Sequence, residues 1–233
     1  MNIEKRKLYR SAYPGLLFAI FLCLIKVVES VFDVSLYKLG IKPLDFNGLI
    51  GIVTSPMIHS DWGHLGSNTL PLIILSTGIF YFYRKIALEV VLSVYFSTGF
   101  WVWLFARETY HIGASGIIYG FAAFIFFSGI FRREKWSIAL ALAVMVLYGG
   151  MVKGIAPSPD HPHMSWESHL IGGLSGILVA FYYRKAHNAR FLQRKIDEAK
   201  PEDRMSLTYF NDERESFPTI TYHYKGKDKN EKT

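Results

Sequence analysis

A serine lies between glycines at the head of a very apolar segment, in the run His-Ile-Gly-Ala-Ser-Gly-Ile-Ile-Tyr-Gly from 111 to 120. A serine hydroxyl can attack an acyl group if a base lies within hydrogen-bond reach and donors face the developing oxyanion. We expect Ser115 to be this nucleophile and His169 to be its base. No acidic residue is obviously placed to orient His169, so the sequence predicts a Ser-His dyad rather than a triad.

Two further polar residues could stabilise the oxyanion. His64 and Asn68 are four residues apart and so share one face at the start of a predicted helix. We expect both side chains to donate to the oxyanion, together with the backbone N–H of Ser115. Tyr119, one turn after Ser115, could stack on the imidazole of the base. We expect His59 to stabilise the loop that leads into the same helix as His64.

Glycines explain how the nucleophile and the base could meet. Gly116 and Gly120 form one pair with small-xxx-small spacing, and Gly172 and Gly176 form another. Such faces let helix backbones approach closely in lipid. Gly113 likewise leaves the backbone two residues before Ser115 without a side chain.

The composition predicts an all-α, polytopic membrane protein with six transmembrane helices. The chain has 233 residues, of which 51% are hydrophobic and 16% aromatic, with a mean hydropathy of +0.20. A membrane-spanning helix needs about 20 apolar residues. Six segments approach that length: 14–34, 65–83, 86–105, 113–131, 136–151 and 168–183.

Basic residues predict the orientation of these segments. Lys and Arg are concentrated before the first segment, after the second and fourth, and after the sixth. The positive-inside rule then places both termini in the cytoplasm. The predicted parts are a cytoplasmic N-terminus at 1–13, a six-helix domain at 14–185 and a charged cytoplasmic tail at 186–233, with a hairpin at 206–224 or disorder. Segments 65–83, 113–131 and 168–183 would deliver their polar ends to one depth near the outer surface.

Other features narrow the function. The net charge of +7 comes from scattered basic residues and not from a patch, which argues against nucleic-acid binding. The single cysteine, Cys23, provides no disulfide framework. We expect Lys26 and Glu29 to pair or to snorkel, and His111, His161 and His163 to be solvated loop residues. We expect no cleaved signal peptide, no cofactor, and a multi-pass location in the cell (inner) membrane.

Three pieces of this pattern, in this order, resemble the rhomboid family of intramembrane serine proteases. They are H-x-x-x-x-H-x-x-x-N at 59–68, G-A-S-G at 113–116 with Tyr119, and H-x-x-G-x-x-x-G at 169–176. The resemblance covers about 14–183. It implies a six-helix core, cleavage of other membrane proteins in or beside a transmembrane segment, and water entry from the extracytoplasmic side. It also implies catalysis by Ser115 and His169 with oxyanion stabilisation by His64 and Asn68.

The chain departs from the family pattern in one place, and other functions remain open. Many members carry a Trp-Arg pair in the first outer connection, where this chain has Gly40-Ile-Lys-Pro43. One alternative is a histidine-rich metal-binding membrane transporter that uses His59, Asp61, His64, His161, His163 and His169. The other is a non-catalytic, rhomboid-like chaperone. The expected partners are transmembrane protein substrates and the lipid bilayer, and the oligomeric state is left open.

Overall fold

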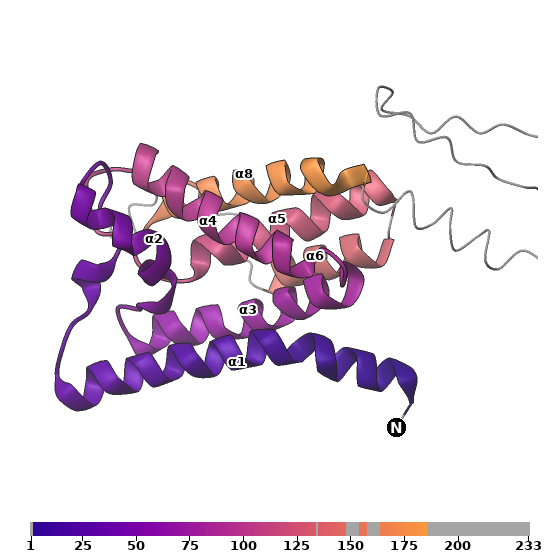
Figure 1. Ribbon diagram of the computed structural model, residues 1–233, viewed down its shortest axis with the longest axis horizontal. Helices are drawn as coiled ribbons and strands as arrows, with labels where there is room; N and C mark the ends of the chain where they lie inside the picture. Colours follow the sequence, from indigo (N-terminus) through magenta and orange to yellow (C-terminus); the bar gives the residue numbers. More distant parts are fainter. Residues whose placement is uncertain (1, 134, 148–153, 158–163, 186–233) are drawn as a thin grey trace, which may run out of the picture. The chain divides into compact units, whose positions relative to one another are not determined.

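The computed structural model describes residues 2–133, 135–147, 154–157 and 164–185, and every regular element in these ranges is helical (Figure 1). The long helices are α1 (Ile3–Phe32), α3 (Trp62–Phe82), α4 (Ala87–Phe105), α5 (Ser115–Arg132), α6 (Lys135–Leu147) and α8 (Trp166–Tyr182). The short ones are η1 (Tyr37–Leu39), η2 (Phe46–Ile50), α2 (Gly51–Thr54), η3 (Ser55–Met57) and η4 (Tyr183–Lys185). The predicted helical class is therefore confirmed. The tail and its predicted hairpin lie outside the described residues.

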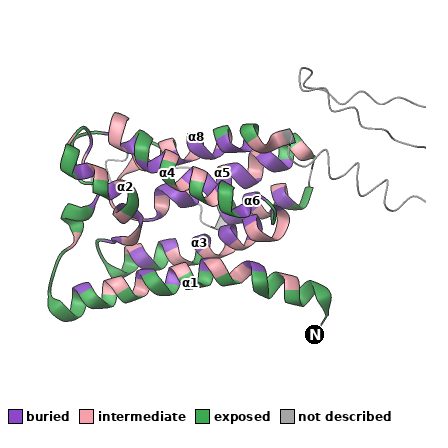
Figure 2. Cartoon of the chain, in the orientation of Figure 1, coloured by how far each residue is buried: buried purple, intermediate pink, exposed green. Residues whose placement is uncertain are grey.

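Among the described residues, four helices are long and apolar enough to cross a membrane, namely α1, α3, α4 and α5. Their outward faces carry exposed Leu, Ile, Val and Phe. Figure 2 shows that much of α1 in particular is exposed. A soluble helix would place these side chains inside, whereas lipid accepts them. The chain is an integral membrane protein.

Helix α1 begins earlier than the predicted segment at 14. Asn2 caps it, since the Asn2 side chain accepts a hydrogen bond from the N–H of Glu4 at 3.4 Å. The helix continues through Pro14 and ends at Asp33, which adopts a left-handed conformation with φ of 49°. The predicted membrane-spanning segment 14–34 thus covers the later part of a longer helix, because the charged residues before Pro14 are helical as well.

The arrangement of the helices brings several of their ends together. Helices α3, α5 and α8 begin at one end of the bundle, where α1 and α4 finish (Figure 1). Helix α5 packs on α3, α4, α6 and α8, with its most extensive contact on α8. Phe124 and Ile125 of α5 and Leu75 and Ile79 of α3 are completely buried in this core. The starts of α3, α5 and α8 can therefore share one site.

The contact between α5 and α8 depends on glycine. A Cβ added at Gly172 would overlap the carbonyl oxygen of Gly116, and one added at Gly176 would overlap that of Gly120. A Cβ at Gly120 would in turn lie 3.0 Å from the carbonyl oxygen of Gly172. Backbone therefore meets backbone along this crossing, as the two small-xxx-small pairs predict.

The first connection is anchored although it lacks the Trp-Arg pair. The N–H of Ile41 donates to the carbonyl of His111 at 2.9 Å, and the N–H of His111 donates back at 2.8 Å. The indole N–H of Trp103 donates to the carbonyl of Asp45 at 2.9 Å. Hydrogen bonds to α4 and to the loop before α5 thus hold this segment, and in each of them the segment contributes backbone groups.

Candidate active site

Ser115 and His169 meet at the crossing of α5 and α8. Ser115 is the first residue of α5, and His169 lies in the first turn of α8. The Oγ of Ser115 is 2.7 Å from the Nε2 of His169, whose side chain is buried. This distance is within the range of a strong O–H···N hydrogen bond. A hydroxyl and an imidazole are thus paired in water-poor surroundings.

The second nitrogen of His169 defines the direction of that hydrogen bond. Its Nδ1 is 2.8 Å from the carbonyl oxygen of Gly154, which can only accept. In the neutral ring the proton therefore lies on Nδ1, and Nε2 is free to accept the hydroxyl proton of Ser115. The carbonyl of Gly154 takes the place that an aspartate occupies in a triad. The sequence carries no signal for this partner, because any residue has a carbonyl.

Tyr119 fixes the orientation of the imidazole from the other side. The rings of Tyr119 and His169 are stacked with centroids 4.3 Å apart and an interplanar angle of 4°. Because Tyr119 is one helical turn beyond Ser115, α5 supplies both the hydroxyl and the ring that holds the imidazole. This is the contact that the spacing of these residues predicts.

His64 and Asn68 face the backbone just before Ser115. A Cβ added at Gly113 would lie 2.8 Å from both Cε1 and Nε2 of His64 and 3.8 Å from Nδ2 of Asn68. Gly113 has a φ of +103°, a conformation that side chains disfavour. Glycine is therefore required at 113 for two reasons, the lack of space beside His64 and the positive φ. The Nδ2 of Asn68 is buried and has no hydrogen-bond partner among the described residues, so its donor capacity is unused there.

The hydrogen bonds around His64 indicate its tautomer. The hydroxyl of Ser60 donates to the carboxylate of Asp61 at 2.6 Å, which leaves the Ser60 oxygen as an acceptor. That oxygen is 3.2 Å from Nδ1 of His64. A neutral His64 in this pattern carries its proton on Nδ1 and has no N–H on Nε2. Asn68 is therefore the better placed side-chain donor of the two.

His59 contacts the residue that precedes the serine. The N–H of Ala114 donates to its Nε2 at 3.4 Å, and its ring packs edge-on against that of His64 with centroids 5.0 Å apart. Burial, followed by the proximity of His64, lowers the pKa of His59 from 6.5 to about 4. His59 is therefore neutral near pH 7 and can accept this hydrogen bond.

Lys26 of α1 holds the His59 loop. Its ammonium donates to the carbonyls of His59 at 2.9 Å and Ser60 at 3.1 Å, and it forms an ion pair with Glu29 at 3.2 Å. The second oxygen of Glu29 accepts the N–H of Leu36 at 2.8 Å. The predicted pairing of Lys26 with Glu29 is confirmed, and the pair also ties α1 to the loop before α3.

The prediction that His111 is a solvated loop residue is wrong. His111 is only 2% exposed, because its ring is covered by the start of α8. Its Nδ1 is 3.1 Å from the hydroxyl of Ser165, and its Nε2 is 3.0 Å from the carbonyl of Arg107. The ion pair of Arg107 with Glu167, at 3.1 Å, closes the same junction. His111 thus joins the loop before α5 to α8, which the sequence analysis missed.

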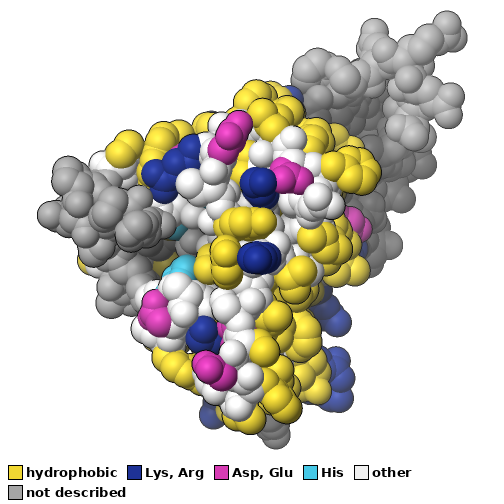
Figure 3. Space-filling view, turned by 90° about the vertical axis from the view of Figure 1, so that its left-hand side faces the viewer, with side chains coloured by type: hydrophobic (Ala, Val, Ile, Leu, Met, Phe, Trp, Pro, Cys, Tyr) yellow, Lys and Arg dark blue, Asp and Glu magenta, His cyan; other side chains and the backbone are white. Residues whose placement is uncertain are grey.

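The described part of the chain holds no group of three or more His, Cys, Asp or Glu that could bind a metal ion. Of the six residues of the metal-binding alternative, His161 and His163 lie outside that part. Figure 3 views the end at which α3 and α5 begin, and histidine shows there as only a small area among the described atoms. The nearby histidines are instead engaged with Ser115, Ala114 and Ser60.

The fold and site define a polytopic helical membrane protein with a Ser-His pair at its helix ends, and comparisons give its family. A Rhomboid domain is matched at residues 47–186. An uncharacterized protein of Mycobacterium bovis is 33% identical over 178 residues, which are 71% of this chain and 72% of the relative. One of Mycobacterium leprae is 33% identical over 188 residues, 76% of this chain and 74% of the relative. No solved structure gives a significant match. The chain belongs to the rhomboid family, as the sequence motifs indicated.

Proposed function

We propose that this protein is an intramembrane serine endopeptidase that cleaves transmembrane segments of other membrane proteins with a Ser115-His169 dyad. The observation that carries the proposal is the 2.7 Å contact between Oγ of Ser115 and Nε2 of His169. The free donor of Asn68 beside the same backbone supports it. A packing serine would need neither the imidazole nor the bare glycines around it.

The reaction follows from the hydrogen bonds. Nε2 of His169 takes the hydroxyl proton while Oγ of Ser115 attacks a peptide carbonyl. The imidazolium that forms is stabilised by the carbonyl of Gly154 at Nδ1 and by the stacked ring of Tyr119. The same proton then passes to the leaving amine. A water molecule hydrolyses the acyl-enzyme by the reverse sequence of proton transfers.

The negative charge of the tetrahedral intermediate needs donors that are already oriented. Nδ2 of Asn68 and the backbone N–H of Ser115, at the start of α5, supply them. A single donor of this kind contributes about 3 kcal/mol in the transition state. His64 can donate to the oxyanion only when its Nε2 carries a proton. This is the case in the imidazolium, or in the neutral ring once the contact of Nδ1 with Ser60 has changed.

The placement in the membrane follows the positive-inside rule. Six spans, formed by α1, α3, α4, α5, α6 and α8, would put both termini in the cytoplasm of a cell whose inner membrane holds the protein. The starts of α3, α5 and α8, and hence the dyad, would then lie near the outer surface, where water can enter.

A substrate helix must unwind locally before it can react. A carbonyl in an intact helix is hydrogen-bonded and surrounded by side chains, so Ser115 cannot approach it. Substrates should therefore carry Gly or Pro near their outer ends, since these residues weaken a helix. Equal rates on a poly-Leu segment and on one that contains glycine would contradict this part of the proposal.

The test is cleavage of a transmembrane substrate by the purified protein in vesicles. Ser115→Ala should lose activity on the order of 10⁴-fold or more, and the parent alone should react with a serine-directed fluorophosphonate. Ser30→Ala is the matched control, because Ser30 is an exposed serine of α1 outside the site. A chaperone would show no labelling and would tolerate Ser115→Ala. A metal transporter would depend on metal and not on Ser115.

A further inference from the structure

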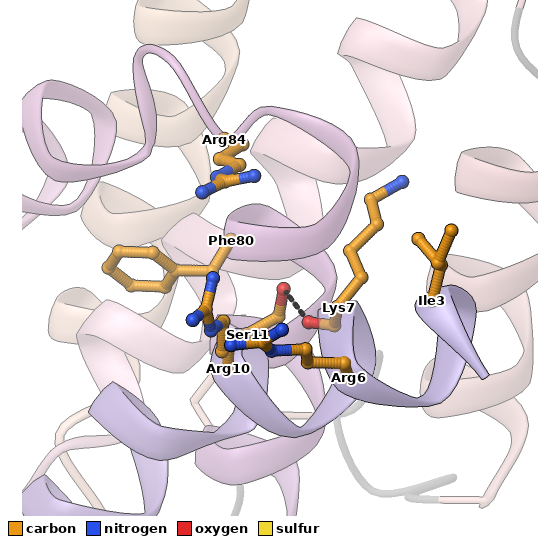
Figure 4. Close-up of a pocket in the computed structure, with 7 residues that line it drawn as sticks. All are labelled: Ile3, Arg6, Lys7, Arg10, Ser11, Phe80 and Arg84. Atoms are coloured by element: carbon orange, nitrogen blue, oxygen red, sulfur yellow. Dashed lines mark hydrogen bonds between the residues drawn. The ribbon is translucent and has the colours of Figure 1, made fainter. Parts of the chain in front are cut away.

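A basic pocket lies between the start of α1 and the end of α3, at the opposite end of the bundle from Ser115. Figure 4 shows its lining, with Arg84 across from the residues of α1. The cavity measures about 470 Å³ and is lined by Ile3, Arg6, Lys7, Arg10, Ser11, Phe80 and Arg84. Four of these seven side chains are cations and none is an acid. A pocket of this composition attracts anions.

Within the described residues, no acid balances the positive charges of the pocket. None of the four cations forms an ion pair with an acid of the described chain. The ammonium of Lys7 lies 4.1 Å from the ring centroid of Tyr81, and the hydroxyl of Tyr81 donates to the carboxylate of Glu4 at 2.8 Å. The nearby acid is thus engaged outside the pocket lining. Like charges that converge in this way repel one another until an anion joins them.

The length of α1 places this pocket at the depth of lipid headgroups. Its 30 residues extend about 45 Å, whereas the hydrocarbon core is about 30 Å thick. The polar first turns of the helix must therefore emerge from the core at this end. Tyr9 and Tyr13 are 66% and 62% exposed just there, and exposed tyrosines mark the membrane interface.

We propose that this pocket binds the phosphate of an anionic phospholipid headgroup. The guanidinium groups of Arg6, Arg10 and Arg84 can each offer two parallel N–H donors to phosphate oxygens. Phe80 provides an apolar wall toward the bilayer core. Because Arg84 follows α3 and the other cations belong to α1, one bound lipid would join the two helices at the end where the contacts of Tyr81 with Glu4 and Lys7 already link them.

The test measures lipid binding and is independent of proteolysis. The full-length protein in detergent is titrated with phosphatidylglycerol, with phosphatidylcholine of the same acyl chains, and with inorganic phosphate, and bound lipid is counted by native mass spectrometry. We expect preferential binding of phosphatidylglycerol. Arg6→Gln with Arg84→Gln should weaken it on the order of tenfold, because each cation near an anionic lipid contributes substantially to affinity.

Lys5→Gln with Lys85→Gln is the matched control. It removes the same charge from the neighbouring residues, which are exposed and do not line the pocket. The affinity of this control variant for phosphatidylglycerol should differ from that of the parent by less than about threefold. A second pocket variant, Arg10→Gln, should weaken binding in the same direction, and unchanged melting temperatures in lipid-free detergent would show that the variants fold. Equal losses of phosphatidylglycerol binding in both pairs of variants, equal binding of phosphatidylglycerol and phosphatidylcholine, or full displacement of phosphatidylglycerol by inorganic phosphate would overturn the proposal.

Discussion

Two helix contacts in this protein both depend on glycine, but they differ in the kind of atom that each glycine faces. Helix α8 meets α5 through Gly172 and Gly176, and α1 meets α3 through Gly15. At the first contact an added Cβ would strike backbone oxygens. At the second it would strike the hydroxyl of Ser76. A side chain can rotate away, whereas a carbonyl in a helix can move only with the helix. Ser115 and His169 thus lie at the less adjustable of these two contacts.

The two contacts are connected through His59. Its carbonyl is held by Lys26 of α1, and its imidazole accepts the N–H of Ala114 directly before α5. Movement of α1 is therefore transmitted to the peptide in front of the nucleophile. The four changes that follow test this difference between a rigid and an adjustable contact.

The largest effect is expected from Gly172→Ala. Its Cβ overlaps the carbonyl oxygen of Gly116, so α5 and α8 must separate, which should cost about 3 kcal/mol or more of unfolding free energy. The distance between Ser115 and His169 should increase with it, and activity should fall on the order of 10²-fold. Gly173→Ala is the control, since nothing lies within 4 Å of its added Cβ. Equal melting temperatures and cleavage rates for the two variants would disprove the rigid contact.

The next effect is a loss of stability in acid that depends on His59. Its pKa is about 4 in the folded protein and 6.5 without burial, so between these values the unfolded chain binds the proton more tightly. The contribution of His59 to the unfolding free energy is therefore fully present above pH 6.5. The unfolding free energy should decrease by about 3 kcal/mol as the pH falls to 4. Unfolding curves across this range should show the change. The buried His111, whose pKa is also lowered by burial, adds to it.

His59→Gln isolates this contribution, because glutamine can accept the N–H of Ala114 but does not titrate. The variant should lose less stability between pH 6.5 and 4 than the parent. Parallel curves would mean that His59 is not the group responsible.

Lys26→Met tests the tie between the two contacts. The change removes the donor to the carbonyls of His59 and Ser60 and leaves Glu29 buried without its cation, which should cost about 2 kcal/mol. Adding Glu29→Gln should recover part of this loss, because glutamine is neutral and can still accept the N–H of Leu36. A double-mutant cycle with urea or thermal unfolding measures the coupling. Additive losses would mean that the ion pair contributes nothing.

These contacts also show what the sequence can predict. The length of the apolar segments predicts the helices. The spacing of the glycines, Ser115 and His169 predicts the approach of α5 to α8, because each of these patterns lies within one helix or on one helix face. The carbonyl of Gly154 at His169, the burial of His111 and the hold of Lys26 on the His59 loop were not predictable. Each joins residues distant in the chain, and all three involve backbone carbonyls, which leave no mark on residue type.

Gly15→Ala should have the smallest effect and the most informative rescue. The new Cβ overlaps Oγ of Ser76, so we expect a loss of about 1 kcal/mol while the hydroxyl is displaced from its 3.2 Å bond to Ile73. In a Ser76→Ala background the hydroxyl is gone and the nearest remaining atom is the Cβ of residue 76, 3.2 Å from the added Cβ, so Gly15→Ala should cost much less there, as melting temperatures of the four proteins would show. No side-chain deletion can rescue Gly172→Ala in the same way. If Ser76→Ala fails to rescue Gly15→Ala, the Cβ of residue 76 at 3.2 Å and the Cα of Ile73 at 3.4 Å from the added Cβ set the distance, and the contact of α1 with α3 is as rigid as that of α5 with α8.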